Sequence, residues 1–367
     1  MPRGRSFTST STGAVAQARS KVERGPAVAG LDLAAERVRA VVGHREDAVL
    51  RITGIAQAPL RPGWMTGGLV VDRVAVGAAV TSALSVAEGR EKATRVVATI
   101  DGDDVRTYHV AITFEREALD VPMAHGEVTR AIQEARADAE RAAREAVSND
   151  PALRGIATVQ LRDDVAGLAL DGRPLASLLG FQGRFVEVRT DVSLAPLVLA
   201  SAASGALDAA KRKGSVSSGA YALGRLLASS GLAEGGVLRI GADVTAFAVI
   251  RGGRVVATRA FGLGRDAFLA RPGRANRDAA TWASCVTAPL PGFDGLLPGR
   301  WHFVGVPEDL VELPRALGTA LSEERGGGEV ELAPLRPALA TRVLSQEPLH
   351  ADDLVAVGAA ALAAGMS

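Results

Sequence analysis

Two segments far apart in the chain share one pattern, and this repeat constrains the fold more than any other feature. In each segment an apolar strand enters a tight turn of small or polar residues and leaves as a second strand. Such a turn brings backbone N–H groups up to a phosphate where glycine allows a close approach. If the two turns face each other, they would clamp a nucleotide between two halves of the molecule. The segments read Gly30-Leu31-Asp32-Leu33-Ala34-Ala35-Glu36-Arg37 and Leu238-Arg239-Ile240-Gly241-Ala242-Asp243-Val244-Thr245.

The composition narrows the class of protein. A chain of 367 residues has room for about two to three domains. With 42 Lys+Arg against 41 Asp+Glu, the net charge of +1 lacks the electrostatic signature of a nucleic-acid binder. The single cysteine, Cys285, excludes an internal disulfide framework and fits a reducing compartment. Because no apolar run reaches the roughly 18–20 residues of a spanning helix, we expect a cytoplasmic protein.

The two ends of the chain differ in character. Residues 1–26 are basic and lack an apolar period, which predicts a flexible tail. The alternative for this tail is a weak contact with acidic lipid or an acidic partner. Residues 352–364 predict a final helix with Asp352 and Asp353 in its first turn, where they favour the helix dipole. No C-terminal amphipathic membrane anchor is expected.

Between the ends, the pattern predicts an α/β domain that holds a smaller α+β unit. Asp72 is expected to cap a helix over 73–89, among strands at 28–31, 38–42, 49–55 and 95–100. The smaller unit has a helix over 129–147 and strands at 108–114, 156–161, 165–170 and 184–190. Farther on, a hairpin turns at 251–254, residues 265–299 are mostly irregular, a strand covers 300–306 and a helix covers 307–321.

Residues that carry catalysis are scarce. The histidines have no metal-ligand spacing such as i,i+4, and Cys285 has no base near it in the sequence. Neither a G-x-x-x-x-G-K phosphate loop nor a G-x-S-x-G nucleophile turn occurs. We therefore expect no catalytic residue and no metal site. The histidines are His44, His109, His125, His302 and His350.

Five segments resemble, in order and spacing, the FtsA family of bacterial actin-like cell-division proteins, over most of residues 28–364. They cover 30–43, 52–89, 171–193, 237–268 and 302–317. The resemblance implies an α/β, two-lobed actin/Hsp70-like fold with an inserted α+β (SHS2) subdomain and a reduced second-lobe subdomain. Its implied boundaries are a tail at 1–26, the first lobe at 27–107, the inserted subdomain at 108–190, a return and crossover at 191–235, the second lobe at 236–350, shortened near 266–300, and a helix at 351–367.

The resemblance also implies a nucleotide site. Matched to the family's motifs, Asp32 stands at the magnesium-linked aspartate and Arg37 replaces a lysine. The glycine and hydroxyl positions that remain in the later turns are Gly241, Thr245, Gly264 and Gly305. Elsewhere these motifs are altered, and Pro307 follows the adenosine turn without an N–H to offer.

The altered positions predict a degraded pocket. Ala34 and Ala242 place Cβ atoms where backbone would touch phosphate, and Glu36 and Asp243 add negative charge. Arg37 and Arg239 would offset that charge by binding phosphate or by pairing with these two acids, and we favour pairing. We therefore expect no cofactor and weak or absent binding of ATP and Mg²⁺, with Asp32 as the metal ligand only if Mg-ATP binds.

Four functions remain open at this point. The main prediction is a non-catalytic FtsA-like scaffold in cell division, which recruits partners such as an FtsZ-like tail and polymerises into filaments. One alternative is an adaptor similar to PilM, which lacks the membrane anchor and binds the cytoplasmic tail of a membrane protein in pilus assembly. The others are a weak ATPase of the same superfamily, and an unrelated α/β protein whose turns are plain hairpins.

The helix over 129–147 is the predicted partner interface. Its acidic and basic residues alternate, which is usual for a solvated face with local ion pairs. Because the inserted subdomain meets partners in the resembled family, its exposed face is also a candidate contact surface. The candidate residues are Glu134, Arg136, Asp138, Arg141 and Arg144.

Overall fold

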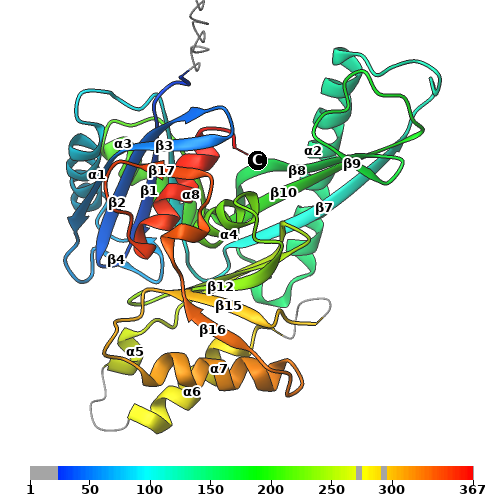
Figure 1. Ribbon diagram of the computed structural model, residues 1–367. Helices are drawn as coiled ribbons and strands as arrows, with labels where there is room; N and C mark the ends of the chain where they lie inside the picture. Colours follow the sequence, from blue (N-terminus) through cyan, green and yellow to red (C-terminus); the bar gives the residue numbers. More distant parts are fainter. Residues whose placement is uncertain (1–23, 270–274, 291–295, 367) are drawn as a thin grey trace, which may run out of the picture.

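The computed structural model describes residues 24–269, 275–290 and 296–366, which form two lobes and a projecting subdomain (Figure 1). The first lobe is built on a six-stranded sheet in the order β11-β6-β1-β2-β3-β17. The sheet is mixed as expected, because β1, β2 and β3 are antiparallel while β6, β11 and β17 join in parallel. Its strands are β1 (Val28–Ala34), β2 (Arg37–Glu46), β3 (Val49–Pro59), β6 (Arg95–Ile100), β11 (Ser215–Ser218) and β17 (Val343–Ser345).

Two helices cover one face of this sheet, α1 (Arg73–Glu88) and α3 (Leu197–Ala209). The Asp72 carboxylate accepts a hydrogen bond from the Ala75 backbone N–H at 2.9 Å, so the predicted helix cap is confirmed. A two-stranded hairpin, β4 (Met65–Thr66) and β5 (Leu69–Val70), precedes α1.

The inserted subdomain is a four-stranded antiparallel sheet in the order β7-β10-β8-β9, with helix α2 (His125–Asn149) packed on one face. The two strands expected at 156–161 and 165–170 are one strand, β8, because β10 pairs with it along its whole length and register shifts absorb the irregular residues. The other elements are β7 (Arg106–Glu115), β8 (Thr158–Leu170), β9 (Arg173–Leu175), β10 (Phe185–Pro196) and the 3₁₀ turn η1 (Pro151–Leu153).

The second lobe holds a five-stranded sheet in the order β14-β13-β12-β15-β16. Residues 265–299 are less irregular than expected: α6 (Ala275–Thr287) buries Ala279, Trp282 and Val286 in a core that it shares with α7. The helix expected from residue 307 begins only at Glu312. The remaining bounds are β12 (Glu234–Ile240), β13 (Thr245–Arg251), β14 (Arg254–Phe261), β15 (Arg300–Val304), β16 (Glu331–Pro334), α5 (Asp266–Leu269), α7 (Glu312–Glu324) and the 3₁₀ turn η3 (Pro337–Leu339).

Two helices, α4 (Gly219–Ser229) and α8 (Leu354–Ala363), join the lobes. They pack against each other, α8 lies on β1, and α4 lies on β13 and β14 (Figure 1). Glycine allows the closest approaches, because a Cβ on Gly30 would lie 1.9 Å from the Ala356 carbonyl oxygen and one on Gly358 would lie 2.4 Å from that of Ala222. One apolar core therefore continues from the first lobe into the second.

The structure moves two predicted boundaries. Gly25, expected in the tail, donates its backbone N–H to the Arg45 carbonyl at 3.0 Å, so the chain joins β2 before residue 27. The rest of the predicted tail, residues 1–23, lies outside the described residues. Strand β17, expected in the second lobe, pairs with β3 in the first because the chain returns there before η4 (Ala351–Asp353) and α8.

Candidate functional site

The two strand–turn–strand segments face each other where the lobes meet. The turns after β1 and after β12 line one common space, which measures only about 20 Å³, close to the volume that holds one water molecule. Ala34, Ala35 and Ala242 are among the residues that line it. The Asp243 carboxylate accepts a hydrogen bond from the Gly67 backbone N–H of the first lobe at 2.6 Å. The predicted juxtaposition is therefore present, and the second turn is also joined to the hairpin of β4 and β5 through Gly67.

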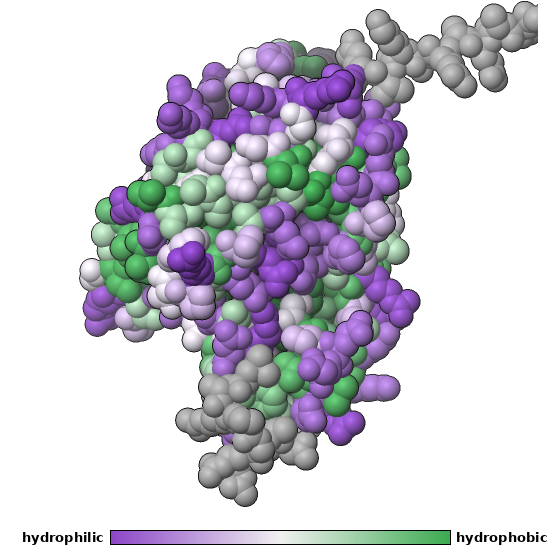
Figure 2. All heavy atoms as spheres, turned by 90° about the vertical axis from the view of Figure 1, so that its left-hand side faces the viewer, coloured by the Kyte–Doolittle hydropathy of each residue, from purple (hydrophilic) through white to green (hydrophobic). Residues whose placement is uncertain are grey.

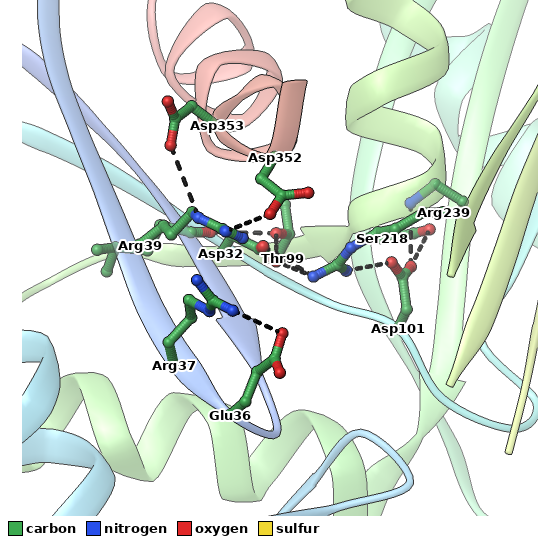
Figure 3. Close-up of polar contacts among 12 residues, drawn as sticks. Asp32, Glu36, Arg37, Arg39, Thr99, Asp101, Ser218, Arg239, Asp352 and Asp353 are labelled. Carbon is green, nitrogen blue, oxygen red and sulfur yellow. Dashed lines mark hydrogen bonds and ion pairs between the residues drawn. The ribbon is translucent and has the colours of Figure 1, made fainter. Parts of the chain in front are cut away.

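Arg239 lies at the centre of this contact (Figure 3). From β12 of the second lobe its Nη2 reaches both carboxylate oxygens of Asp32, on β1, at 2.7 Å. Its Nη1 donates to Asp101, just after β6, at 2.8 Å. The side chains of Asp32 and Asp101 are 1% and 2% exposed, and that of Arg239 is 13% exposed. We call these three residues the interlobe triad.

Neighbouring groups determine the balance of charge in the triad. Asp101 also accepts the Ala220 backbone N–H, 3.0 Å away at the N-terminus of α4, where the helix dipole favours a negative charge. Burial raises the pKa of Asp32, and the Arg239 guanidinium opposes that rise. Burial lowers the pKa of Arg239, but the two carboxylates outweigh it and raise that pKa above its ordinary value. Arg239 therefore stays protonated.

A second ionic group lies at the first turn. Arg37 Nη2 is 3.1 Å from Glu36 Oε1, which is the internal pairing that we favoured. The other Glu36 oxygen accepts a hydrogen bond from Arg265 of the second lobe. Arg239 also pairs internally, but with Asp32 and Asp101 in place of the expected Asp243, which is engaged by Gly67. These pairings neutralise the site within the protein.

The other predicted nucleotide residues converge on the turn after β12. Gly241 donates its N–H to the Val244 carbonyl at 2.8 Å, and the buried Thr245 hydroxyl donates to the Leu263 carbonyl at 2.6 Å. A Cβ on Gly264 would lie 2.3 Å from the Ala242 carbonyl oxygen. Gly305 has a φ of +89°, and a Cβ there would lie 2.2 Å from the Ile240 carbonyl oxygen. The structure thus brings these residues together. The contacts that each one makes are with the protein backbone, so close packing of the chain accounts for the glycines and the threonine at these positions.

A wider cleft of about 790 Å³ opens beside the triad. Its first-lobe wall is polar and includes Arg37 and Arg39, whereas Leu310 and Pro314 contribute apolar surface from the second lobe. Arg39 is itself paired, with Asp352 at 2.6 Å and Asp353 at 3.6 Å (Figure 3). The cleft therefore has the size of a small-molecule site, and the arginines that line it are paired within the protein.

The fold resemblance implies Mg-ATP between the turns, and the residues present do not fit it. Both oxygens of Asp32, the implied metal-linked carboxylate, are engaged by Arg239. Space alone does not exclude a nucleotide, because residues of both turns, among them Ala34 and Gly241, line the 790 Å³ cleft. Glu36 also lines this cleft and adds negative charge beside any phosphate that would bind there. No chemical step through a nucleotide follows from this arrangement.

Sequence reasoning missed three residues of the site. The sequence marks Asp101 only as a turn residue and assigns no role to Arg39 or Arg265. A signal for Asp101 does exist, because it follows a buried strand, and the carboxyl ends of parallel strands meet at one edge of a sheet. Arg265 and Arg39 carry no local signal, since their acidic partners lie in distant parts of the chain.

The predicted interface on α2 is exposed and bears local ion pairs. Arg141 lies 2.6 Å from Asp138, Arg144 lies 2.7 Å from Glu140, and Arg136 lies 3.5 Å from Asp163 of β8. Glu134 is exposed on the same helix. Within the described residues, no three His, Cys, Asp or Glu side chains are grouped to hold a metal ion. Over the same ranges, no helix is long and apolar enough to cross a membrane.

No protein-family model matches the sequence, and neither does the sequence of any curated protein. Solved structures do match the fold. A chain of the PilM–PilN type IV pilus biogenesis complex has a TM-score of 0.56 and 20% identity, over 92% of this chain and 98% of that chain. The ethanolamine utilization protein EutJ from Carboxydothermus hydrogenoformans has a TM-score of 0.44 and 13% identity, over 92% and 90%.

The chain therefore has the two-lobed, actin-like ATPase fold that the family resemblance implied. At 20% identity the likeness establishes the fold and leaves function to the site. In this chain an arginine of the second lobe pairs with two buried aspartates of the first lobe, beside an open cleft.

Proposed function

We propose that this chain is a non-catalytic adaptor of actin-like fold that links protein partners in a type IV pilus or secretion assembly. The interlobe triad carries the proposal, because Arg239 engages the one carboxylate that would serve Mg-ATP. A protein of this fold that lacks a working nucleotide site can still act by binding other proteins through its surface. On this proposal the chain does not hydrolyse ATP.

The choice of assembly is supported by the likeness to a chain of the PilM–PilN complex over nearly the full length of both chains. That complex pairs PilM with a second protein, so we expect this chain to hold a protein partner such as the cytoplasmic tail of a membrane protein. Such a partner would recruit the chain to the inner face of the membrane. The cell-division role, with an FtsZ-like partner and filaments, stays a prediction.

An adaptor needs exposed surfaces that suit a partner, and the first lobe offers one. Figure 2 shows apolar residues gathered among polar ones on the face that carries α1. Val74 of α1 is 77% exposed and Val198 of α3 is 60% exposed. Large apolar side chains exposed together are typical of surfaces that bind other proteins. The exposed charges of α2 offer a second, polar surface.

Calorimetry with Mg-ATP tests the non-catalytic part. The purified full chain should show no heat of binding at micromolar ATP, because Arg239 engages both oxygens of Asp32 and Glu36 adds negative charge at the cleft. An ATP-binding kinase of the same fold, titrated identically, provides the positive control. Saturable micromolar binding by this chain would contradict the proposal.

Affinity capture from a lysate of the source cells tests the adaptor part. The tagged chain should retain a membrane protein of a pilus or secretion assembly, identified by mass spectrometry. An FtsZ-like protein retained instead would favour the division role. A variant with reversed charges on α2 and its matched control on α7 are described in the Discussion.

A further inference from the structure

The interlobe triad is accompanied by three further polar contacts that cross from one lobe to the other. Arg239 reaches Asp32 and Asp101, and Arg265 reaches Glu36. The remaining two contacts join a carboxylate to a backbone N–H: Asp243 accepts from Gly67 at 2.6 Å, and Asp103 accepts from Gly262 at 2.5 Å. The triad and these three contacts therefore join the lobes through groups of the protein itself, without a ligand.

The triad differs from the other three contacts in burial and in charge. Two carboxylates buried near each other repel, and Asp101 helps to raise the pKa of Asp32 for that reason. Arg239 is the cation that makes the pair tolerable, and its planar guanidinium suits two carboxylates at once. Removing it would leave two buried carboxylates without a cation, a condition that separates the charged groups or draws in water.

We propose that Arg239 is a built-in cation that holds the two lobes in one fixed arrangement, so that closure of this molecule needs no ligand. The inference rests on the proposed function, in which the nucleotide site is inactive, and adds how the lobes are positioned in its place. Partner-binding surfaces on the two lobes are then always presented in the same relative orientation. Such a protein acts as a constant bridge, without a ligand-driven switch.

The chain offers a direct way to measure the arrangement. Its single cysteine, Cys285, is exposed on α6 of the second lobe, and Val74 is exposed on α1 of the first. The full-length V74C protein, labelled at both cysteines with spin labels, reports the interlobe distance by pulsed electron spin resonance. We expect one narrow distance distribution, which Mg-ATP at millimolar concentration leaves unchanged.

Variants of the triad should broaden that distribution. Arg239→Met in the V74C protein should give a broad or two-peaked distribution, because two carboxylates lose their cation. The double variant D32N/R239M removes opposite charges together, so it keeps a folded sample available if R239M alone is insoluble. It should also be broad. Arg300→Met, which removes an exposed arginine paired with Glu331 in the same lobe, is the control and should match the parent.

The outcomes separate the two proposals. A narrow, parent-like distribution in D32N/R239M, or a broad one in the parent protein, would overturn the fixed-lobe inference and leave the adaptor function standing. Micromolar ATP binding with an unchanged narrow distribution would overturn the non-catalytic function and leave the built-in cation standing. Broadening in the double variant, and in R239M where that protein is soluble, but not in R300M, is the result we expect.

Discussion

Single residues decide whether the space between the lobes is available to a ligand. Arg239 alone engages Asp32 through both carboxylate oxygens and also reaches Asp101. A lysine could not replace it without loss, since an ammonium lacks the planar set of donors that contacts two carboxylates at once. Glu36 has a comparable role at the edge of the cleft, between Arg37 and Arg265.

Glu36 gives a pH-dependent test at the residue scale. Burial raises its pKa, but hydrogen bonds and charge from Arg265 and Arg37 outweigh this and lower the pKa below its ordinary value of 4.5. A carboxylate with a lowered folded pKa stabilises the protein above pH 4.5, and that contribution is lost as the pH falls through its folded pKa. Glu36→Gln should therefore reduce stability at neutral pH, and less so below pH 4.5.

Urea denaturation of the wild type and E36Q at several pH values measures this difference. Glu331→Gln is the control, because Glu331 is 61% exposed in a surface ion pair that contributes little at any pH. A stability difference for E36Q that stays constant down to acid pH would show that the pairing with Arg265 does not hold in solution.

At the scale of elements, the local sequence pattern predicted well whether a segment is a helix or a strand. It predicted less well where each element begins and ends. Helix α1 begins where Asp72 caps it, and the turn at 251–254 is a hairpin with Gly252 and Gly253 both at positive φ. Helix α6 was missed because its Pro- and Gly-rich surroundings hide the buried apolar residues Ala279, Trp282, Ala283 and Val286, which recur at helical spacing. Their burial depends on α7, which no local window contains.

Helix α2 gives the test at this scale. Reversal of Arg136, Arg141 and Arg144 to Glu should abolish partner capture if the exposed face is the interface. The fold should survive, because a like-charge pair such as the one that Arg141→Glu creates with Asp138 costs only about 0.2–0.5 kcal/mol. Capture from lysate, with circular dichroism on the same samples, checks both expectations.

Reversal of the exposed Glu323 and Glu324 to Lys on α7 is the matched control, since it changes the charge of a helix in the second lobe, away from the inserted subdomain. Unchanged capture by the α2 variant would exclude this face and direct attention to the apolar surface around Val74 and Val198.

At the scale of the whole molecule, the lobes share one core. Helices α4 and α8 lie between the two sheets, and the core around them takes in Val28 from the first lobe and Val237 from the second. The triad and the other interlobe contacts join the lobes near the cleft, outside this shared core. The lobes should therefore unfold together.

The close packing of α8 makes that expectation testable. Gly30→Ala and Gly358→Ala would each place a Cβ within 2.4 Å of a backbone oxygen. The packed elements would have to shift to make room for it. Each should cost roughly 1–3 kcal/mol or more and lower the thermal midpoint of both lobes, reported by near-ultraviolet circular dichroism and by labelled Cys285.

Gly318→Ala is the matched control, since Gly318 lies within α7 with open space around it. It should raise stability by about 0.5–1 kcal/mol, as alanine is the better helix former. Separate transitions for the two lobes in G30A would refute the shared core.

The amino-acid sequence by itself determined the α/β class, the two facing turns, the two-lobed fold and the loss of the residues that a phosphate requires. The α/β class and the two turns follow from local periodicity, glycine and side-chain type, which a short window contains, whereas the two-lobed fold and the altered phosphate turns follow from the order and spacing of segments that resemble a known family. Only the tertiary structure decided that Arg239 pairs with Asp32 and Asp101, which lie 207 and 138 residues away. Ionic attraction depends on distance through space, and that distance exists only once β1, β6 and β12 have been brought together by the packing of the two sheets.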